Sequence, residues 1–467
     1  MKHGYFSNSV LRGLGALGLL ATGLIAPLAA SAQAPSLAAA ASALVSRAES
    51  LGQVRVIVGL NVPAAPEGTL DASAVESQRQ AISAAAAQVS AVFGADSVVR
   101  SFETIPYTTL SLTAAEVQRL ATTPGVTSIH EDVPLPPLLD TSTAVIGSRG
   151  LWRRGVDGSG WATAVLDTGF YYRHRAFDDA VLSSACYSSN DSFYGSTSLC
   201  RGGVTSETGG RVAPNCDASI SGCGHGTHVA ATVLGRFPRA MRGVAPAAQL
   251  IAIQVFSRFP STYCSGGSDC VLAFQSDQIA GLERVAAMAP FYDIASANLS
   301  LGGGYYASSC DSELPAYTAV VDQLTSLGVA VVIASGNSYY TDGVGFPACI
   351  SNAVTVGATD DSDAIASFSN QANGLVDLMA PGVNIEAAYI NYRRETAVLS
   401  GTSMATPHVA GAFAQLRQAK PTATVAEILA ALQCTATSVS RVGTVGTFQR
   451  INVGLARQEL LMGGLCP

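Results

Sequence analysis

Residues 329–334 read VAVVIA, six consecutive residues without a polar side chain. A strand that is apolar on both faces is typical of a parallel sheet covered by helices on both sides. Four further segments are nearly continuous in apolar residues: residues 162–166, 249–255, 294–299 and 353–356. Stretches with helical periodicity lie between or after them, at residues 225–234, 278–289, 315–327 and 402–418. The alternation predicts an α/β domain over residues 140–467 with a doubly wound, mostly parallel sheet. Its active residues should lie at the carboxyl ends of strands and at helix starts.

A smaller unit comes before this domain, in residues 33–139, and its compact part covers about residues 54–132. The pattern predicts the order strand, helix, strand, strand, helix, strand, which is a small α+β, ferredoxin-like domain. The segments are 55–60, 74–93, 97–102, 108–112, 114–122 and 126–130. We expect the Ala/Ser-rich residues 33–53 to be flexible and the Pro-rich residues 133–140 to form an extended linker.

The first 32 residues have the pattern of an export signal. Lys2 and Arg12 precede an apolar run over residues 14–26, and the small residues Ala30-Ser31-Ala32 offer a cleavage site. The run is shorter than the roughly 20 residues that a membrane-spanning helix needs. We therefore expect a signal peptide, no membrane association after its removal, and a secreted (extracellular or periplasmic) protein.

Composition narrows the class of protein further. Hydrophobic residues make up 48% of the 467 residues and charged residues 13%, and the formal charge of −7 shows no basic excess. These values favour a large buried core over disorder and give no support for a nucleic-acid partner. We expect the protein to be a monomer. The even number of cysteines, ten, after an export signal predicts disulfides, while the lack of a C-x-x-C pair argues against zinc or redox chemistry. We expect pairing between neighbours along the chain, with Cys434–Cys466 holding the C-terminal end.

Three motifs combine the residue types of nucleophilic catalysis. They are Val165-Leu166-Asp167-Thr168-Gly169, Gly224-His225-Gly226-Thr227-His228-Val229-Ala230 and Gly401-Thr402-Ser403-Met404-Ala405-Thr406-Pro407-His408. A serine hydroxyl becomes a good nucleophile when a histidine takes its proton, and a buried carboxylate holds that histidine in the required tautomer. Asp167 ends a predicted strand, while His225 and Ser403 open predicted helices. The positive end of the serine's helix adds donors for a developing oxyanion.

Together these motifs resemble those of the subtilisin-like serine proteases, the subtilases, over about residues 145–440. The resemblance implies that Asp167 orients, His225 acts as the general base and Ser403 is the nucleophile. Residues 333–337 (IASGN) match the oxyanion strand of the family, so Asn337 should donate its side-chain amide. The Ser403 N–H and the Thr402 hydroxyl would complete the oxyanion hole. The resemblance also implies that residues 33–139 are an inhibitory, foldase-like propeptide that the enzyme removes itself.

The same resemblance implies a substrate site with two walls and a floor. Residues 300–303 resemble the edge strand that pairs with an extended peptide, and residues 334–336 form the second wall. The residue before Phe346-Pro347-Ala348 sets the floor. The implied substrate-binding residues are Ser300, Leu301, Gly302, Gly303, Ala334, Ser335, Gly336 and Gly345. Since none of them is charged, we expect cleavage of proteins and peptides after bulky apolar or aromatic residues. Leu138 and Leu139 before Asp140 fit such a cut.

One feature departs from the family pattern. Asp167 and His225 are 58 positions apart, a wider gap than in the compact bacterial members, and the extra length carries Cys186, Cys200, Cys216 and Cys223. It should form an insertion, tied by disulfides, at the rim of the active site. Catalysis should need no cofactor. Structural calcium stays open, because the acidic loop residues Asp178, Asp179, Asp191 and Asp217 cannot be assigned as ligands.

Three other functions fit the sequence less well. An α/β-hydrolase elbow fails at Ala405, where its second glycine is required. A silent binding protein would usually have lost a member of the triad. A processing protease that cuts after basic residues would need carboxylates at the pocket, and Ser338 follows Asn337 where some relatives carry an acid. We expect His174, His228 and His408 to be structural.

Overall fold

The computed structural model describes residues 37–132, 134–135, 145–236, 242–264, 267–440 and 446–466. The expected export signal and the expected junction after Leu139 lie outside these residues. Within the described part, no helix combines the length and the apolarity needed to cross a membrane. We call residues 37–132 the N-terminal region and residues 145–466 the peptidase region.

The main sheet of the peptidase region is mostly parallel, as the apolar segments predict. Neighbouring strands run parallel from β22 to β7, and antiparallel partners pair at both edges. Across the sheet the strands are β21 (Thr437–Val439), β22 (Phe448–Arg450), β18 (Leu378–Pro381), β17 (Val354–Thr359), β15 (Ala330–Ala334), β13 (Ile294–Leu299), β6 (Ala162–Asp167), β10 (Gln249–Gln254), β7 (Val181–Tyr187) and β9 (Ser206–Gly209).

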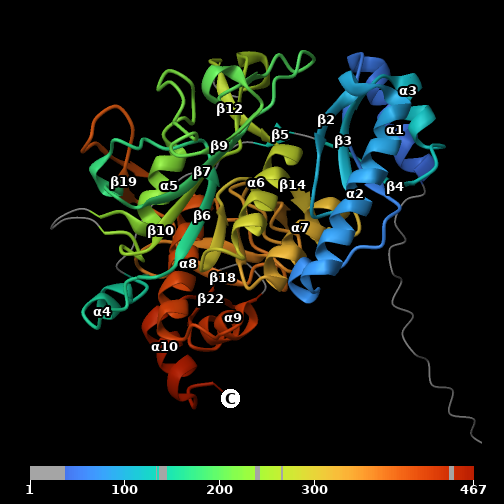
Figure 1. Ribbon diagram of the computed structural model, residues 1–467. Helices are drawn as coiled ribbons and strands as arrows, with labels where there is room; N and C mark the ends of the chain where they lie inside the picture. The colour runs from blue at the N-terminus through green and yellow to red at the C-terminus, as the bar shows by residue number, and fades with distance from the viewer. Residues whose placement is uncertain are drawn as a thin grey trace, which may run out of the picture. The chain divides into compact units, whose positions relative to one another are not determined.

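Helices cover both faces of this sheet. Helices α5 (His225–Leu234) and α8 (Thr402–Ala419) lie on one face, and α6 (Gln275–Met288) and α7 (Pro315–Ser326) lie on the other (Figure 1). The packing of strand β15 explains why its sequence lacks polar residues. Val332 packs in the core with α8, whereas Val331 and Ile333 pack in the core with α7. Both faces of the strand are therefore buried, and the predicted fold class is confirmed.

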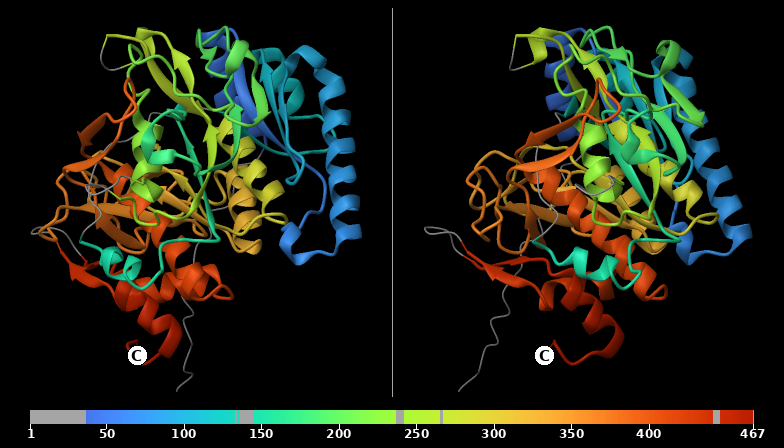
Figure 2. Two further views of the ribbon diagram at one scale, coloured as in Figure 1. Left: turned by 60° about the vertical axis from the view of Figure 1, so that its left-hand side comes forward. Right: turned by 90° about the vertical axis from the view of Figure 1, so that its left-hand side faces the viewer.

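Shorter elements complete the peptidase region. Helices α9 (Val425–Cys434) and α10 (Val453–Met462) lie side by side at one end, near the C-terminus (Figure 2). The remaining elements are α4 (Ser148–Trp152), β8 (Thr197–Ser198), β11 (Ser257–Phe259), β12 (Cys270–Phe274), β14 (Gly303–Tyr306), β16 (Val344–Phe346), β19 (Ile385–Ala388) and β20 (Thr396–Leu399).

The N-terminal region has its elements in the predicted order. An antiparallel sheet with the strand order β2-β3-β1-β4 packs against helices over its own hydrophobic core. The elements are β1 (Val54–Leu60), α2 (Ala72–Phe93), β2 (Val98–Ser101), β3 (Tyr107–Leu112), α3 (Ala114–Leu120) and β4 (Val126–Glu131). The extended linker is described only at β5 (Pro134–Leu135), which pairs with β12.

The expectation of a flexible segment over residues 33–53 is wrong for its described part. Residues 37–51 form helix α1, whose Ala41, Leu44 and Ala48 are buried in the core of the N-terminal region. Alanine has the highest helix propensity, and these three residues recur on one face of the helix. Residues 37–51 form a helix because this apolar face packs on the core. Without that packing, an isolated helix of this length would be only marginally stable.

Candidate active site

Asp167 and His225 form a buried pair where β6 ends and α5 begins. Nδ1 of His225 lies 2.7 Å from Oδ1 of Asp167, and both side chains are almost fully buried. The backbone N–H of Thr168 donates to the same oxygen at 2.7 Å. A carboxylate accepts, so the proton on Nδ1 points to Asp167 and leaves Nε2 as the basic nitrogen.

A glycine lets the helix start approach the strand end. A Cβ on Gly226 would lie 2.5 Å from the carbonyl oxygen of Gly169 and 3.0 Å from Cβ of Asp167. The N–H of Gly226 instead donates to Oγ1 of Thr168 at 3.0 Å. The glycine after His225 in the second motif is therefore required by the close packing of α5 on β6.

Ser403 lies in the first turn of α8, which packs against α5. Its hydroxyl donates to the carbonyl oxygen of Ser300 at 3.2 Å, and the hydroxyl of Ser300 donates to the carbonyl oxygen of Ser403 at 2.6 Å. Nδ2 of Asn298 donates to the Ser300 hydroxyl at 3.0 Å. The end of β13 therefore holds the start of the serine's helix in place.

Thr402 holds the side chain of Asn337 through two hydrogen bonds to its amide oxygen. Oδ1 accepts the N–H of Thr402 at 2.8 Å and the hydroxyl of Thr402 at 3.0 Å. With Oδ1 occupied, the amide nitrogen is the end of Asn337 that remains for a ligand. The Thr402 hydroxyl, which we expected to face an oxyanion, gives its single proton to Asn337 and accepts the N–H of Gly336 at 3.2 Å. In this geometry Thr402 positions the side chain of Asn337.

Two of the residues expected to bind substrate, Gly303 and Ser335, contact Gly345. Its N–H donates to the carbonyl oxygen of Ser335 at 2.9 Å, and a Cβ there would lie 3.3 Å from the backbone N and O of Gly303. Gly303 also pairs with Phe346 across β14 and β16. One residue of each expected wall, Gly303 and Ser335, therefore lies against the expected floor.

Asn370 supports this site and was not identified from the sequence. Its Oδ1 accepts the N–H groups of Ser338 and Tyr340, at 2.8 and 3.2 Å, and its Nδ2 donates to Ser335 at 3.0 Å. The side chain is buried. A buried amide with these three partners fixes the loop that carries Asn337. The only signal in the sequence was the polar run Ser369-Asn370-Gln371.

Structural contacts are found for the three histidines that were expected to be structural, His174, His228 and His408. His228 is fully buried, which lowers its pKa to about 3, and its Nε2 donates to the carbonyl oxygens of Ile385 and Ala397 at 3.2 and 3.1 Å. This neutral imidazole ties α5 to the β19–β20 hairpin. His174 accepts the N–H of Ala176 at its helix start, and His408 bonds within α8.

The four acidic candidates for calcium do not form a common site. Asp217 accepts the N–H and the hydroxyl of Ser219, and Asp191 accepts the N–H groups of Phe193 and Tyr194. These carboxylates cap turns. Within the described ranges, no group of three or more His, Cys, Asp or Glu side chains is arranged to hold a metal ion.

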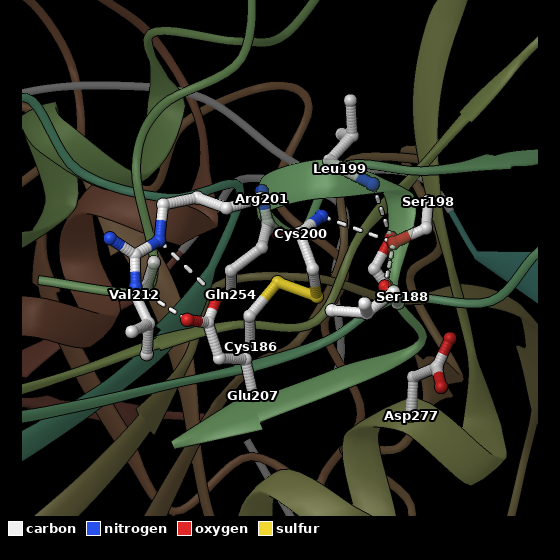
Figure 3. Close-up of a disulfide and its surroundings, with 12 residues drawn as sticks. Cys186, Ser188, Ser198, Leu199, Cys200, Arg201, Glu207, Val212, Gln254 and Asp277 are labelled. Atoms are coloured by element: carbon white, nitrogen blue, oxygen red, sulfur yellow. Dashed lines mark hydrogen bonds and ion pairs between the residues drawn. A yellow bond between two sulfur atoms is a disulfide. The ribbon is translucent and has the colours of Figure 1, made fainter. Parts of the chain in front are cut away.

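All ten cysteines are paired with the next cysteine along the chain, as predicted. The pairs are Cys186–Cys200, Cys216–Cys223, Cys264–Cys270, Cys310–Cys349 and Cys434–Cys466. The first two lie in the insertion between Asp167 and His225. Figure 3 shows Cys186–Cys200 with the hydroxyl of Ser188, which accepts the N–H of Leu199 at 2.8 Å.

Comparison with known proteins agrees with this geometry. The sequence model of the subtilase family matches residues 158–451. The chain belongs to the subtilase family. This subtilase is 32% identical to an alkaline protease of Shouchella clausii over 354 residues, which cover 75% of this chain and 79% of the relative. It is 36% identical to subtilisin Savinase of Lederbergia lenta over 295 residues, or 63% of this chain and 90% of the relative.

A fungal relative shares a shorter segment. The subtilase is 38% identical to a cuticle-degrading serine protease of Arthrobotrys oligospora over 191 residues, which cover 41% of this chain and 40% of the relative. The family match and the bacterial relatives make the chain a serine endopeptidase of the subtilisin type, acting on protein substrates without a cofactor for catalysis.

Proposed function

We propose that this subtilase cleaves peptide bonds with Ser403 as nucleophile, His225 as general base and Asp167 as the orienting acid. The observation that supports this assignment most strongly is the buried 2.7 Å contact between Nδ1 of His225 and Oδ1 of Asp167. Such a contact fixes the tautomer that a base needs and stabilises the imidazolium that forms. Substitution of these residues, described in the Discussion, tests the assignment.

The proposed reaction has two halves. Oγ of Ser403 bonds to the scissile carbonyl carbon while Nε2 of His225 takes its proton. The resulting oxyanion accepts hydrogen bonds from Nδ2 of Asn337 and the backbone N–H of Ser403. The C–N bond then breaks, and the imidazolium protonates the leaving amine. Water, deprotonated by His225, hydrolyses the acyl-enzyme and regenerates Ser403.

Replacing Asn337 with leucine tests the oxyanion hole. Leucine keeps the approximate volume but has no donor, so we expect kcat to fall by roughly 10²–10³-fold with a small change in KM. Steady-state kinetics on a peptide amide measure both. Thr402→Val should have a weaker effect of the same kind, because valine leaves Asn337 in place without the hydroxyl that holds it. An unchanged kcat for Asn337→Leu would remove Asn337 from the mechanism.

We also propose that the residue before the cut is bulky and apolar or aromatic. The eight residues assigned to the substrate site contain no charged side chain, and Gly345 at the expected floor carries no side chain that could fill the pocket. Burial of an apolar side chain there is favourable, whereas lysine or arginine would meet no counter-charge. A peptide-library profile should show Phe, Tyr, Leu or Met before the cut. A profile dominated by Lys or Arg would contradict the pocket assignment.

The N-terminal region is proposed to be an inhibitory propeptide, made after an export signal and removed by the enzyme itself. Its contacts with the peptidase region support this role. Asp132, at its end, accepts the N–H of Ser276 at 2.8 Å in the first turn of α6. That helix has no side-chain cap of its own, so the carboxylate satisfies one of its free donors. N-terminal sequencing of the mature, secreted protein tests export and processing together.

A second contact predicts how release of the N-terminal region depends on pH. Glu283 of α6 accepts the N–H of Glu103 at 3.0 Å and the N–H and hydroxyl of Thr104 at 2.7 Å, and burial raises its pKa to about 7. Exposed by release, the carboxyl should return to its ordinary pKa of about 4.3. The docked state then holds a proton that the separated state loses. Docking is therefore strongest below about pH 4.3 and weakens as the pH rises toward 7.

After cleavage, activity should appear as the N-terminal region is released. We expect this rate to be about tenfold higher or more during preincubation at pH 8 than at pH 5, with the activity of both samples assayed at one common pH. Glu283→Gln should reduce this ratio, and Glu76→Gln, on the exposed face of α2, should not. The charged and titratable neighbours of Glu283 are Glu103, Arg79, Arg284 and Tyr187. Faster activation at pH 5 would contradict the sign of the prediction.

A further inference from the structure

The insertion between Asp167 and His225 contains a turn that contacts the N-terminal region. We call residues 188–196 the insertion turn. It follows β7, and the Cys186–Cys200 disulfide closes the loop that contains it (Figure 3). Its side chains contact Arg55, which lies on the central strand β1 of the N-terminal region and has an exposed fraction of 2%.

The guanidinium of Arg55 binds Asp132, at the end of the N-terminal region. Its Nε donates to Oδ2 of Asp132 at 3.0 Å, and its Nη2 lies 2.8 Å from the same oxygen. Nη2 also donates to the hydroxyl of Ser276 at 2.7 Å, in the first turn of α6. Arg55 is therefore part of the contact between the two regions.

The insertion turn and β12 surround the rest of the guanidinium. Nη2 lies 3.4 Å from the hydroxyl of Ser189, and Nη1 lies 3.8 Å from Oδ2 of Asp191. The plane of the group lies over the ring of Phe274, 3.7 Å from its centre. A carboxylate, a hydroxyl and an aromatic face match a planar cation better than they match an ammonium.

Contacts within the peptidase region hold the insertion turn in place. The other carboxylate oxygen of Asp191 accepts the N–H groups of Phe193 and Tyr194, both at 3.0 Å. The ring of Tyr194 contacts the rings of Phe259, Tyr263 and Phe274. These contacts, with the disulfides Cys186–Cys200 and Cys264–Cys270, hold the turn against β12.

A second arginine is linked to the same turn through Asp277. Arg100 of β2 forms an ion pair with Asp277, whose carboxylate also accepts the N–H and hydroxyl of Ser189, both at 3.0 Å. Asp277 is fully buried. Ser189 therefore connects the binding sites of both arginines. The N-terminal region supplies the cations, and the peptidase region supplies Asp191 and Asp277.

We propose that the insertion turn is a guanidinium-specific socket that recognises the N-terminal region and sets how long the enzyme stays inhibited. The partner it fits is a β-sheet surface that presents an arginine, as β1 presents Arg55. This inference rests on the proposed inhibitory role of the N-terminal region. It adds a recognition site outside the catalytic residues, made by the part of the chain that compact relatives are expected to lack. Removing one partner from a buried charge pair is far more costly than removing a surface charge.

The test measures the time that precursor takes to develop activity on a chromogenic peptide after dilution. Arg55→Met should shorten this time by about 10²-fold, since it leaves Asp191 and Asp132 without their cation. Arg55→Lys should give an intermediate value because an ammonium lacks the planar fork. Asp191→Asn, which leaves the sequence of the N-terminal region unchanged, should also shorten it. The matched control is Arg119→Met, because Arg119 contacts Val92 and Phe93 of its own region.

The variants separate the possible failures. If Arg55→Met does not fold, Asp191→Asn still tests the socket from the other side. Suppose that the wild-type precursor activates slowly, as an inhibitory N-terminal region requires. If Asp191→Asn and Arg55→Lys then activate at the same rate as wild type, the proposed socket is wrong, while the inhibitory role of the N-terminal region stands. Full activity of wild-type precursor from the first moment would overturn the inhibitory role, and with it the socket. Activity of a Ser403→Ala precursor would instead overturn the catalytic assignment.

Discussion

Replacing Ser403 with alanine is expected to lower kcat by roughly 10⁶-fold, the size of loss known from a subtilisin that lacks its nucleophile. Alanine removes the only atom that bonds to the substrate and leaves the backbone N–H in place. The variant should also fold, since among the described residues the lost hydroxyl donates one hydrogen bond, 3.2 Å long, to the carbonyl oxygen of Ser300. The precursor should therefore accumulate uncut.

The measurement is hydrolysis of casein, together with the size of the protein secreted from a host without other proteases. Ser438→Ala, on the exposed face of β21, serves as the control and should keep both activity and processing. A mature band from Ser403→Ala in such a host would contradict removal of the N-terminal region by the enzyme itself. Retained hydrolysis by purified Ser403→Ala would show that Ser403 is not the nucleophile.

Replacing His225 with alanine should be as damaging, roughly 10⁶-fold in kcat, because the hydroxyl of Ser403 then has no base. Asp167→Asn should cost less, about 10⁴-fold. An asparagine amide at this position can donate to Nδ1 and so favours the tautomer with its proton on Nε2, which cannot accept from Ser403. Steady-state kinetics rank the three variants. A loss for Asp167→Asn below tenfold would contradict the proposed role of the 2.7 Å contact.

Much of the fold could be predicted because buried strands and helices require apolar residues at regular positions in the sequence. Strand β15 is apolar throughout since both of its faces are covered, and the start and end of α5 match the predicted residues 225–234. Helix α1 was missed for a physical reason. Its Ala/Ser-rich composition is typical of a flexible segment, whereas its apolar face is ordered by packing on a sheet whose strands come later in the chain.

The candidate site also has a part that could be predicted from the sequence and a part that could not. Asp167, His225, Ser403 and Asn337 lie in local motifs, so their positions follow from short stretches of sequence. The contact between Thr402 and Asn337 joins segments 65 positions apart, and Asn370 reaches back 35 positions to Ser335. No local pattern specifies these hydrogen bonds, because they depend on how loops meet after the sheet has formed. The socket for Arg55 is a still longer-range example, with 134 positions between Arg55 and Ser189.

The most direct test of the proposed mechanism is covalent labelling of the mature enzyme with a serine-directed organophosphorus fluoridate. The fluoride leaves as the nucleophilic oxygen bonds to phosphorus, so the label marks the residue that attacks. Peptide mapping by mass spectrometry should find one label per molecule, on Ser403, with activity lost in proportion to labelling, and no label on His225→Ala. Complete inactivation with the label on another residue, or labelling of Ser403 without loss of activity, would contradict the account.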